Sequence, residues 1–302
     1  MLPSHIQLSR LRERWLIDGW FIAEALVPED EIARARRELQ EMFPDAESVS
    51  GKPDLVHHAE QFLGMVDFPF RYPTINKVAA HERISELVSA IFGDDRIMLF
   101  QARAWAKFTG AADYEQLLHR DFRNFTLTVV DPSRPEYSQM VGMLYLSDVT
   151  EDLGPTRLVS RYHTVQLPLY AEHLSKNEYR SVYATEQSAV APAGSLLAFS
   201  PDVMHRATNL VAPGGSRFTV MLGYQCTGHQ WQGYKSWPKM GHNDEMIAFV
   251  ESATPRQLEL IGFPPPNHPF WSATTIRGVR ERYPNADFDA FFDAPTHMVN
   301  ST

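Results

Sequence analysis

A succession of short β-rich segments between residues 97 and 226 limits the fold more than any other feature of this sequence. Within 97–107, Gln101, Arg103, Trp105 and Lys107 alternate with alanines, which is typical of a strand with two different faces. Turn sequences rich in proline and glycine divide the segments, for example at 131–135 and 212–215. Many short strands separated in this way predict an all-β sandwich or barrel. We expect two facing sheets built from strands near 97–107, 125–130, 140–147, 195–200, 204–209 and 217–226.

Amphipathic patterns predict helices on both sides of this β-rich centre. Segments 28–43 and 77–92 each carry one apolar stripe, and each should pack on the outer face of a sheet. Pro28 and the acids after it are typical of a helix start, and Gly93 of a helix end. Segment 44–76 has no clear period and is interpreted as a loop. Near the C-terminus, Thr254 followed by Pro255 predicts another helix start, with Gly262 and Pro264 marking its end.

We therefore expect one catalytic domain over residues 1–302. Its parts are a helical front at 1–95, a β core at 96–226, and a C-terminal extension of helices and loops at 227–302. The chain length allows this, because all-β domains often run to about 250 residues.

Composition excludes several classes of function. The net charge of −9 argues against binding to nucleic acid or to an anionic membrane surface. Cys226 is the only cysteine, so no internal disulfide can form, and the N-terminus lacks a continuous apolar stretch of signal-peptide length. We expect a cytoplasmic enzyme that acts on a small molecule, as a monomer or a homodimer.

The segment Leu-Leu-His-Arg-Asp-Phe at 117–122 carries the most specific chemistry. His119 and Asp121 are two positions apart, so on an extended backbone both side chains point to the same face. One imidazole and one carboxylate provide two of the three ligands in the facial triad of iron(II) oxygenases. His205 follows the β-rich segment 195–200 and is the expected third ligand. The three residues predict a catalytic metal site.

Arg217 is placed to bind a cosubstrate. It lies twelve positions after His205, beyond the turn at 212–215, and a hairpin would set it opposite residue 208. At about 3.3 Å per residue, this is on the order of 10 Å from the metal ligand. A five-carbon 2-oxo diacid that chelates the metal would present its far carboxylate at that distance. The planar guanidinium of arginine suits such a carboxylate as a bidentate partner.

Over most of residues 15–226 the chain resembles the phytanoyl-CoA dioxygenase family of iron(II)/2-oxoglutarate oxygenases. The resemblance rests on the opening WLIDGWFIAEALVPEDEI, the LLHRDF segment, LYLSDVTEDLGPTRLVSRYH, AGSLLAFSPDVMHRATN and SRFTVMLGYQ. It implies a mainly β fold, a double-stranded β-helix (jelly roll, cupin-like) flanked by N- and C-terminal helices. Three departures stand out: the family commonly reads Pro-Gly-Ser-His at 160–163, often has tryptophan at Met143, and often has serine at Ala207.

The expected cofactors are Fe(II), 2-oxoglutarate and O2. The expected reaction hydroxylates a C–H bond of a small metabolite or natural-product intermediate and releases succinate and CO2. Because halogenating relatives replace the carboxylate ligand by a small residue, Asp121 argues against halogenation. A CoA thioester is disfavoured, since the only dense basic run, Arg34, Arg36 and Arg37, lies on a helix that also carries acids.

Further candidate residues surround this site. Gln101 and Thr219 are candidates for additional contacts to 2-oxoglutarate, and Thr219 shares a strand face with Arg217. Candidates for the substrate pocket are Tyr114, Arg123, Asn124, Met143 and Trp231. Trp231, together with Tyr234 and Trp237, could form a lid, although such aromatic residues more often serve packing.

Two alternative functions stay open. A jelly-roll binding protein could keep the fold without oxygen chemistry, but it has no need for all four of His119, Asp121, His205 and Arg217. A cupin-type metal-dependent isomerase or hydrolase needs a metal, but has no obvious need for an arginine spaced to hold a five-carbon diacid.

Overall fold

The computed structural model describes residues 4–43, 65–121, 138–167, 173–227 and 243–291. The chain forms two compact units, Met1–Lys235 and Ser236–Thr302, and each is described by itself. The expected strand at 125–130 lies outside the described residues, as do Arg123, Asn124 and the expected lid residues Trp231, Tyr234 and Trp237. A single catalytic domain over the whole chain stays a prediction.

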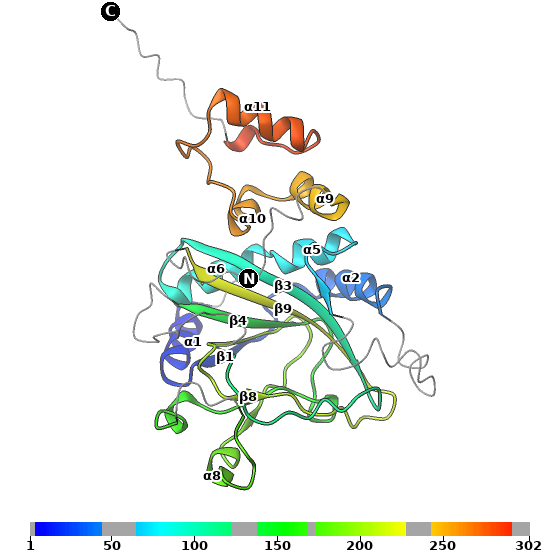
Figure 1. Ribbon diagram of the computed structural model, residues 1–302, viewed down its shortest axis with the longest axis vertical. Coiled ribbons are helices and arrows are strands. Elements are labelled where there is room, and N and C mark those ends of the chain that lie inside the picture. The colour runs from blue at the N-terminus through cyan, green and yellow to red at the C-terminus, as the bar shows by residue number, and fades with distance from the viewer. Residues whose placement is uncertain (1–3, 44–64, 122–137, 168–172, 228–242, 292–302) are drawn as a thin grey trace, which may run out of the picture. The chain divides into compact units, whose positions relative to one another are not determined.

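A six-stranded sheet is the centre of the first unit, and all of its neighbouring strands are antiparallel. Its longest ladder joins β3 to β9, from Ile97 opposite Cys226 to Phe108 opposite Ser216 (Figure 1). In order across the sheet, the strands are β1 (Trp20–Ala23), β7 (Leu196–Phe199), β4 (Gln139–Tyr145), β9 (Ser216–Cys226), β3 (Ile97–Phe108) and β2 (Val66–Asp67).

A smaller sheet packs against one face of the large one. It contains β6 (Gln187–Ser188), β5 (Arg157–Leu158) and β8 (His205–Arg206). Leu158 of β5 shares a buried apolar cluster with Val141 and Tyr145 of β4, and the Tyr145 hydroxyl donates to the Ala189 carbonyl at 2.9 Å. The two facing sheets confirm the predicted jelly-roll class. Among the described residues they do not join edge to edge into a closed barrel.

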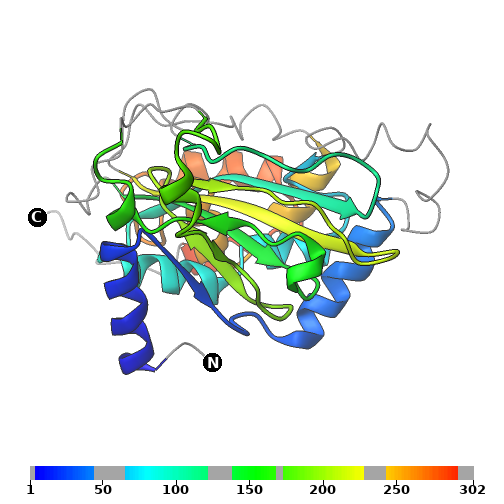
Figure 2. The same ribbon diagram turned by 90° about the horizontal axis from the view of Figure 1, so that it is seen from below.

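Helices flank the large sheet on its other face (Figure 2). The predicted helix near 28–43 is α2, whose buried side chains are Ile32, Ala35 and Leu39. As predicted, Gly93 ends α6 in the left-handed conformation, with φ of 72°. The described helices that precede β3 are α1 (His5–Ile17), α2 (Glu29–Gln40), α5 (Pro73–Ala79) and α6 (Glu82–Phe92).

Two details of the helical front were predicted wrongly. The expected helix at 77–92 is two helices, because the His81 side chain accepts from the Arg83 amide and begins a new helix. The expected loop at 44–76 contains β2 and the start of α5. The cap of α5 comes from another helix: the Glu38 carboxylate accepts from the amides of Thr74 and Ile75 at 3.2 and 2.7 Å.

The remaining described elements of the first unit are short. The turn η2 (Glu151–Leu153) lies between β4 of the large sheet and β5 of the small one, and η3 (Arg161–His163) and α8 (Arg180–Tyr183) lie between β5 and β6.

The second unit consists of helices around an aromatic cluster. Its described elements are α9 (Asp244–Ser252), α10 (Pro255–Leu260), α11 (Ala273–Arg282) and η5 (Asp289–Phe291). As predicted, Thr254 caps α10: its hydroxyl accepts from the Gln257 amide, and Pro255 occupies the first turn. Within the described parts of both units, no helix is long and apolar enough to cross a membrane.

Candidate active site

The segment that carries His119 and Asp121 runs antiparallel to the stretch that carries His205. The backbone amides and carbonyls of His119 and His205 exchange two hydrogen bonds of 3.0 Å. The Asp121 amide donates to the Pro201 carbonyl at 3.1 Å. Beyond the two histidines, the Gln116 side chain accepts from the Ala207 amide at 3.0 Å. Backbone pairing therefore fixes the relative positions of residues that are far apart in the sequence.

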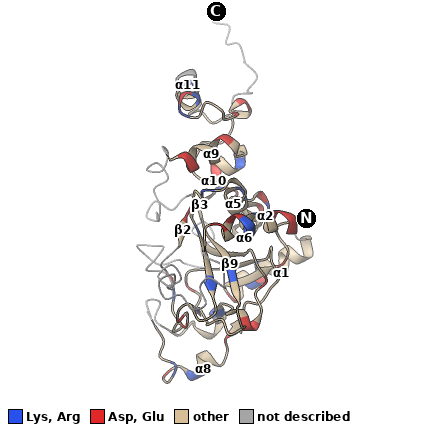
Figure 3. Cartoon of the chain, turned by 90° about the vertical axis from the view of Figure 1, so that its right-hand side faces the viewer, with Lys and Arg blue, Asp and Glu red and all other residues tan. Residues whose placement is uncertain are grey.

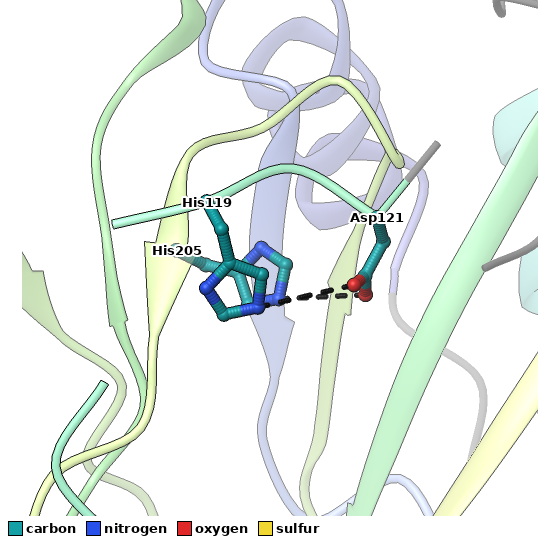
Figure 4. Close-up of side chains that lie close together, drawn as sticks. All are labelled: His119, Asp121 and His205. Atoms are coloured by element: carbon teal, nitrogen blue, oxygen red, sulfur yellow. Dashed lines mark ion pairs between the residues drawn. The ribbon is translucent and has the colours of Figure 1, made fainter. Parts of the chain in front are cut away.

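His119, Asp121 and His205 point toward a common centre (Figure 4). Their ligand atoms all lie within 4.8 Å of one another. Asp121 Oδ2 is 3.4 Å from His205 Nε2, and Asp121 Oδ1 is 3.9 Å from His119 Nε2. Donors bound at about 2.0–2.2 Å to one ion at right angles would be roughly 3 Å apart. The described side chains thus need only a small contraction to hold a single cation.

Each histidine has one ring nitrogen fixed by the backbone. His119 Nδ1 lies 2.9 Å from the Leu117 carbonyl, and His205 Nδ1 lies 3.0 Å from the Val203 carbonyl. A carbonyl can only accept, so each Nδ1 carries a proton, and in the neutral ring each Nε2 has a free lone pair. This pattern is typical of metal-binding histidines, whose second nitrogen is held by a carbonyl or carboxylate.

The acid–base properties of the two imidazoles differ. Burial, followed by the nearby His205, lowers the pKa of His119 to about 4. Burial alone would also lower the pKa of His205, but the charge and hydrogen bond of Asp121 outweigh burial and raise it. When no cation is present, Asp121 therefore favours the protonated form of His205. A divalent ion replaces that proton, because a metal ligand must be a neutral imidazole.

Arg217 lies on β9 with 2% of its surface exposed, and it faces the interior between the sheets. Its guanidinium donates to the carbonyl of Gly154. Gly154 in turn lies against the backbone of Thr208, so closely that a Cβ there would approach the Thr208 oxygen to 2.6 Å. Arg217 is thus near the level of residue 208, three positions beyond His205.

The route by which Arg217 reaches this level differs from the prediction. A β8–β9 hairpin was expected, but β8 pairs with β5 in the small sheet while β9 pairs with β3 and β4 in the large sheet. The turn at 212–215 therefore carries the chain from one sheet to the other. The predicted pairing was wrong because strand patterns do not show which sheet a strand joins.

Several buried polar atoms on this interior face lack partners. Among the described residues, no hydrogen bond is made by Arg217 Nε, Thr219 Oγ1 or either amide atom of Gln101. Thr219 lies opposite Trp105 and Tyr145, and Gln101 opposite Gly223, so all three side chains share one face of the sheet. Buried polar groups are nearly always satisfied. Their number here indicates a polar ligand that accepts hydrogen bonds.

The predicted pocket residues fall in different places. Met143 is partly buried on the same interior face, and its sulfur accepts from the Thr156 hydroxyl at 3.5 Å. Tyr114 is only 2% exposed, and its ring lies 4.6 Å from Lys107 Nζ, so it belongs to the interior rather than to a pocket mouth. Arg123, Asn124 and Trp231 lie outside the described residues. Substrate contacts by these five residues stay predictions.

Two residues near the site received no role from the sequence. Lys107 is buried directly opposite Arg217 in the β3–β9 ladder. The alternation of 97–107 had placed it on the same face as Gln101, and that signal could have found it. His173 is exposed, and its ring centroid lies 5.8 Å from that of His119. No local pattern could have found His173, because the backbone bond from Leu174 to Leu118 brings it there.

The described residues fit both expected groups. Two imidazole nitrogens and one carboxylate on one side of a common centre suit a divalent transition metal with open positions. The unsatisfied donors of Arg217, Thr219 and Gln101 suit an anion with several oxygen acceptors, such as a 2-oxo diacid.

Comparison with known proteins agrees with this geometry. No curated protein matches the chain in sequence. The phytanoyl-CoA dioxygenase (PhyH) family matches residues 16–218, which is more than half of the chain and contains all three residues of the triad together with Arg217. The chain belongs to the phytanoyl-CoA dioxygenase family. The predicted family is thereby confirmed.

Solved structures of similar fold share low sequence identity with this family member. The non-haem α-ketoglutarate-dependent carbocyclase SnoK from nogalamycin biosynthesis is 14% identical, with a TM-score of 0.55 over 72% of this chain and 83% of SnoK. HygX from Streptomyces hygroscopicus, solved with nickel and 2-oxoglutarate, is 16% identical, with a TM-score of 0.52 over 74% and 88%. The epimerase SnoN, solved with Fe3+, α-ketoglutarate and nogalamycin RO, is 16% identical, with a TM-score of 0.51 over 72% and 83%.

One departure from the phytanoyl-CoA dioxygenase family pattern has a structural explanation. Arg161, in the segment where the family commonly has Pro-Gly-Ser-His, pairs with Asp202 and donates to the carbonyls of Trp15 and Leu16 at 3.1 Å. Next to it, the Ser160 hydroxyl donates to Asp18 at 2.6 Å. These contacts fasten the end of α1 to the segment that precedes His205.

Proposed function

We propose that this chain is an Fe(II)- and 2-oxoglutarate-dependent oxygenase that hydroxylates a C–H bond of a small molecule. One observation carries the proposal: the interior between the sheets has three cation ligands at one place and unsatisfied anion-binding donors at another. Family membership and neighbours solved with iron or nickel and 2-oxoglutarate support the same class of enzyme.

In this proposal, His119, Asp121 and His205 would hold Fe(II) through two imidazole nitrogens and one carboxylate. With 2-oxoglutarate and O2, the bound metal supplies oxidative chemistry that yields succinate, CO2 and a hydroxylated product. Arg217, with Thr219 and Gln101, orients the far carboxylate of the diacid. The Phe199 ring, 4.5 Å from that of His205, keeps water from one side of the metal ligand.

The proposed substrate is a metabolite or natural-product intermediate rather than a CoA thioester. Recognition of CoA phosphates requires several cations close together. In the part of the chain that the structure describes, Lys and Arg are interspersed with Asp and Glu on the helices (Figure 3). Arg34, from the densest basic run, pairs with Asp30 at 2.9 Å. SnoK, by its description, comes from nogalamycin biosynthesis, and SnoN was solved with nogalamycin RO.

The two alternatives are weaker for specific reasons. A binding protein gains nothing from two histidines whose Nε2 atoms converge on a carboxylate. A metal-dependent hydrolase or isomerase gains nothing from buried, unsatisfied donors of Arg217 and Thr219. Hydroxylation is preferred to halogenation because Asp121 occupies the position that a halide would need.

Succinate release tests the proposal. Purified protein with Fe(II), ascorbate and 2-oxoglutarate in air should form succinate slowly alone and faster with a substrate from a panel of natural-product intermediates. Product mass then distinguishes hydroxylation, at +16 Da, from desaturation. Asp121→Ala is the matched control and should form none. Absence of 2-oxoglutarate-dependent succinate from the metal-loaded wild type, across the panel, would refute the proposal.

A further inference from the structure

Lys107 is the least expected side chain near the proposed cosubstrate pocket. It lies on β3 directly opposite Arg217 on β9, so the two side chains project from the same face of the sheet. Only 4% of its surface is exposed. Its Nζ lies 4.6 Å from the centroid of the Tyr114 ring, which is within the range of a cation–π contact.

In the described part of the chain, neither Lys107 nor Arg217 forms a salt bridge with a carboxylate. Of the two acids beside Tyr114, Asp113 accepts from the Asn209 side chain at 3.0 Å, and Glu115 pairs with Arg206 and with Lys176, the latter at 3.0 Å. Two buried basic side chains thus share one interior without a described carboxylate between them. A buried charge is normally paired, so both side chains can be charged together only when an anion is bound between them.

We propose that Lys107 is a second ligand for the far carboxylate of the 2-oxo diacid, beside Arg217, and that it takes up one proton from solvent as the diacid binds. The inference rests on the proposed function, because it assumes that the interior holds such a diacid. It goes beyond that function by adding a residue to the pocket and by linking cosubstrate affinity to pH.

The electrostatic surroundings support uptake of the proton. Burial lowers the pKa of Lys107 well below its usual value, and the positive charge of Arg217 lowers it further, while Glu115 opposes them weakly. The groups that face Lys107 are Arg217 from β9, and Tyr114 and Glu115 from the segment after β3; Tyr145 of β4 lies beside Arg217. A carboxylate placed between Lys107 and Arg217 favours the charged ammonium of Lys107, because it supplies the missing opposite charge.

The sign of the pH effect follows from linkage. Where the bound form carries one proton more than the free form, affinity falls as the pH rises, by up to about tenfold per pH unit. Both carboxylates of the diacid are already ionised near neutral pH, so they contribute no proton of their own. Affinity for the diacid should therefore be highest on the acidic side of the range in which the metal site stays loaded.

Calorimetric titration of 2-oxoglutarate into the full-length nickel-loaded protein tests the proposal in two ways. In wild type, buffers of different ionisation enthalpy should report uptake of about one proton per diacid bound. Lys107→Met should raise the Kd for 2-oxoglutarate about tenfold or more and abolish the proton uptake, since an anion loses one of two buried partners. Lys107→Arg, always charged, should keep part of the affinity but none of the uptake.

The matched control is Lys77→Met, at an exposed position on α5, which should change neither quantity. If wild type binds 2-oxoglutarate without proton uptake, or if folded Lys107→Met binds it as wild type does, the role of Lys107 is refuted while the proposed function stands. If nickel-loaded wild type binds no 2-oxoglutarate, the proposed function itself fails. The wild-type measurement needs no mutation, so it decides the matter even where Lys107→Met does not fold.

Discussion

The two polar regions of the interior are built in opposite ways. At the metal end, each histidine has its Nδ1 fixed by a carbonyl, and Asp121 lies 3.4 Å from His205 Nε2. The other region, which carries Arg217 and Lys107, is called the cation end. There Arg217 has one carbonyl partner, and its Nε makes no hydrogen bond among the described residues. The first region is organised for a cation that replaces a proton. The second holds positive charge without its counter-ion.

This difference teaches how a site can be recognised without its ligands. A metal site is visible because its ligand atoms converge on one point even when the ion is absent. An anion site is visible because its buried donors lack hydrogen-bond partners within the described protein. Such unsatisfied groups are rare among buried polar atoms. Both signs occur in one interior, and their coexistence distinguishes a 2-oxoglutarate oxygenase from other metal enzymes. The predictions below separate the two regions.

Removal of a proposed metal ligand should have the largest effect. His205→Ala should weaken binding of Fe(II) or Ni(II) by more than about 100-fold, because even loss of an outer hydrogen bond to a ligand costs about 10–100-fold. Metal content after dialysis measures this loss. His163→Ala, at an exposed histidine of η3, is the matched control and should retain the metal. Equal metal content in the two variants would remove His205 from the site.

Arg217→Ala should leave metal binding intact and weaken the binding of 2-oxoglutarate. Loss of one partner from a buried charge pair costs about 2–5 kcal/mol, so the Kd for 2-oxoglutarate should rise by about 30-fold or more. Arg217→Lys should recover only part of this loss, since an ammonium cannot form two parallel hydrogen bonds. Calorimetric titration of the nickel-loaded variants measures both values. A drop in thermal stability with an unchanged Kd would instead assign Arg217 a purely structural role.

Thr219 and Thr208 offer a matched pair of buried hydroxyls. Thr219 Oγ1 makes no hydrogen bond among the described residues, whereas the Thr208 hydroxyl donates to Pro155 at 2.7 Å. Thr219→Val should leave the free energy of unfolding of the ligand-free protein unchanged, or raise it by about 1 kcal/mol. The same substitution should weaken the binding of 2-oxoglutarate about tenfold. Thr208→Val should do the reverse, with lower stability and unchanged affinity. Urea unfolding measures the stability of both variants, and calorimetry measures their affinity for 2-oxoglutarate. Equal effects of the two substitutions on either quantity would contradict the prediction.

Metal loading should have the smallest effect, a modest rise in thermal stability. A ligand at 100 times its Kd stabilises the folded state by about 2.7 kcal/mol, which corresponds to a few degrees in Tm. Because Asp121 raises the pKa of His205, protons compete with the metal and the rise should shrink as the pH falls. Scanning calorimetry with and without Ni(II) measures it. A rise that grows as the pH falls would contradict histidine ligation.

Much of this architecture could be predicted because it is local. The alternation in 97–107 identifies β3, the β-rich composition of 217–226 identifies β9, and the two-residue spacing of His119 and Asp121 places them together. What could not be predicted depends on contacts between distant segments. Examples are the cap that Glu38 provides for α5, the membership of β8 in the small sheet, and the approach of His173 to His119. None of these leaves a periodic trace in the sequence.

Lys107 combines one feature that the sequence predicts with one that depends on distant contacts. Its face was predicted correctly from the alternation, but its importance depends on the register that sets it opposite Arg217. A shift of one residue would turn it to the outer face of the sheet. The register is set by eleven pairs between β3 and β9, interrupted by an irregularity between Leu99 and Gln101, and sequence patterns alone do not locate such a shift.

The central claim is that the metal end and the cation end bind one molecule. Anaerobic titration of 2-oxoglutarate into the Fe(II)-loaded protein tests it directly, because a 2-oxo acid that chelates iron produces a metal-to-ligand charge-transfer absorption. Wild type should develop this absorption with a saturable midpoint. Arg217→Ala should develop it only at about 30-fold or more higher 2-oxoglutarate, and Asp121→Ala not at all. An Fe(II)-loaded wild type without this absorption, or a folded Arg217→Ala protein with an unchanged midpoint, would contradict the account.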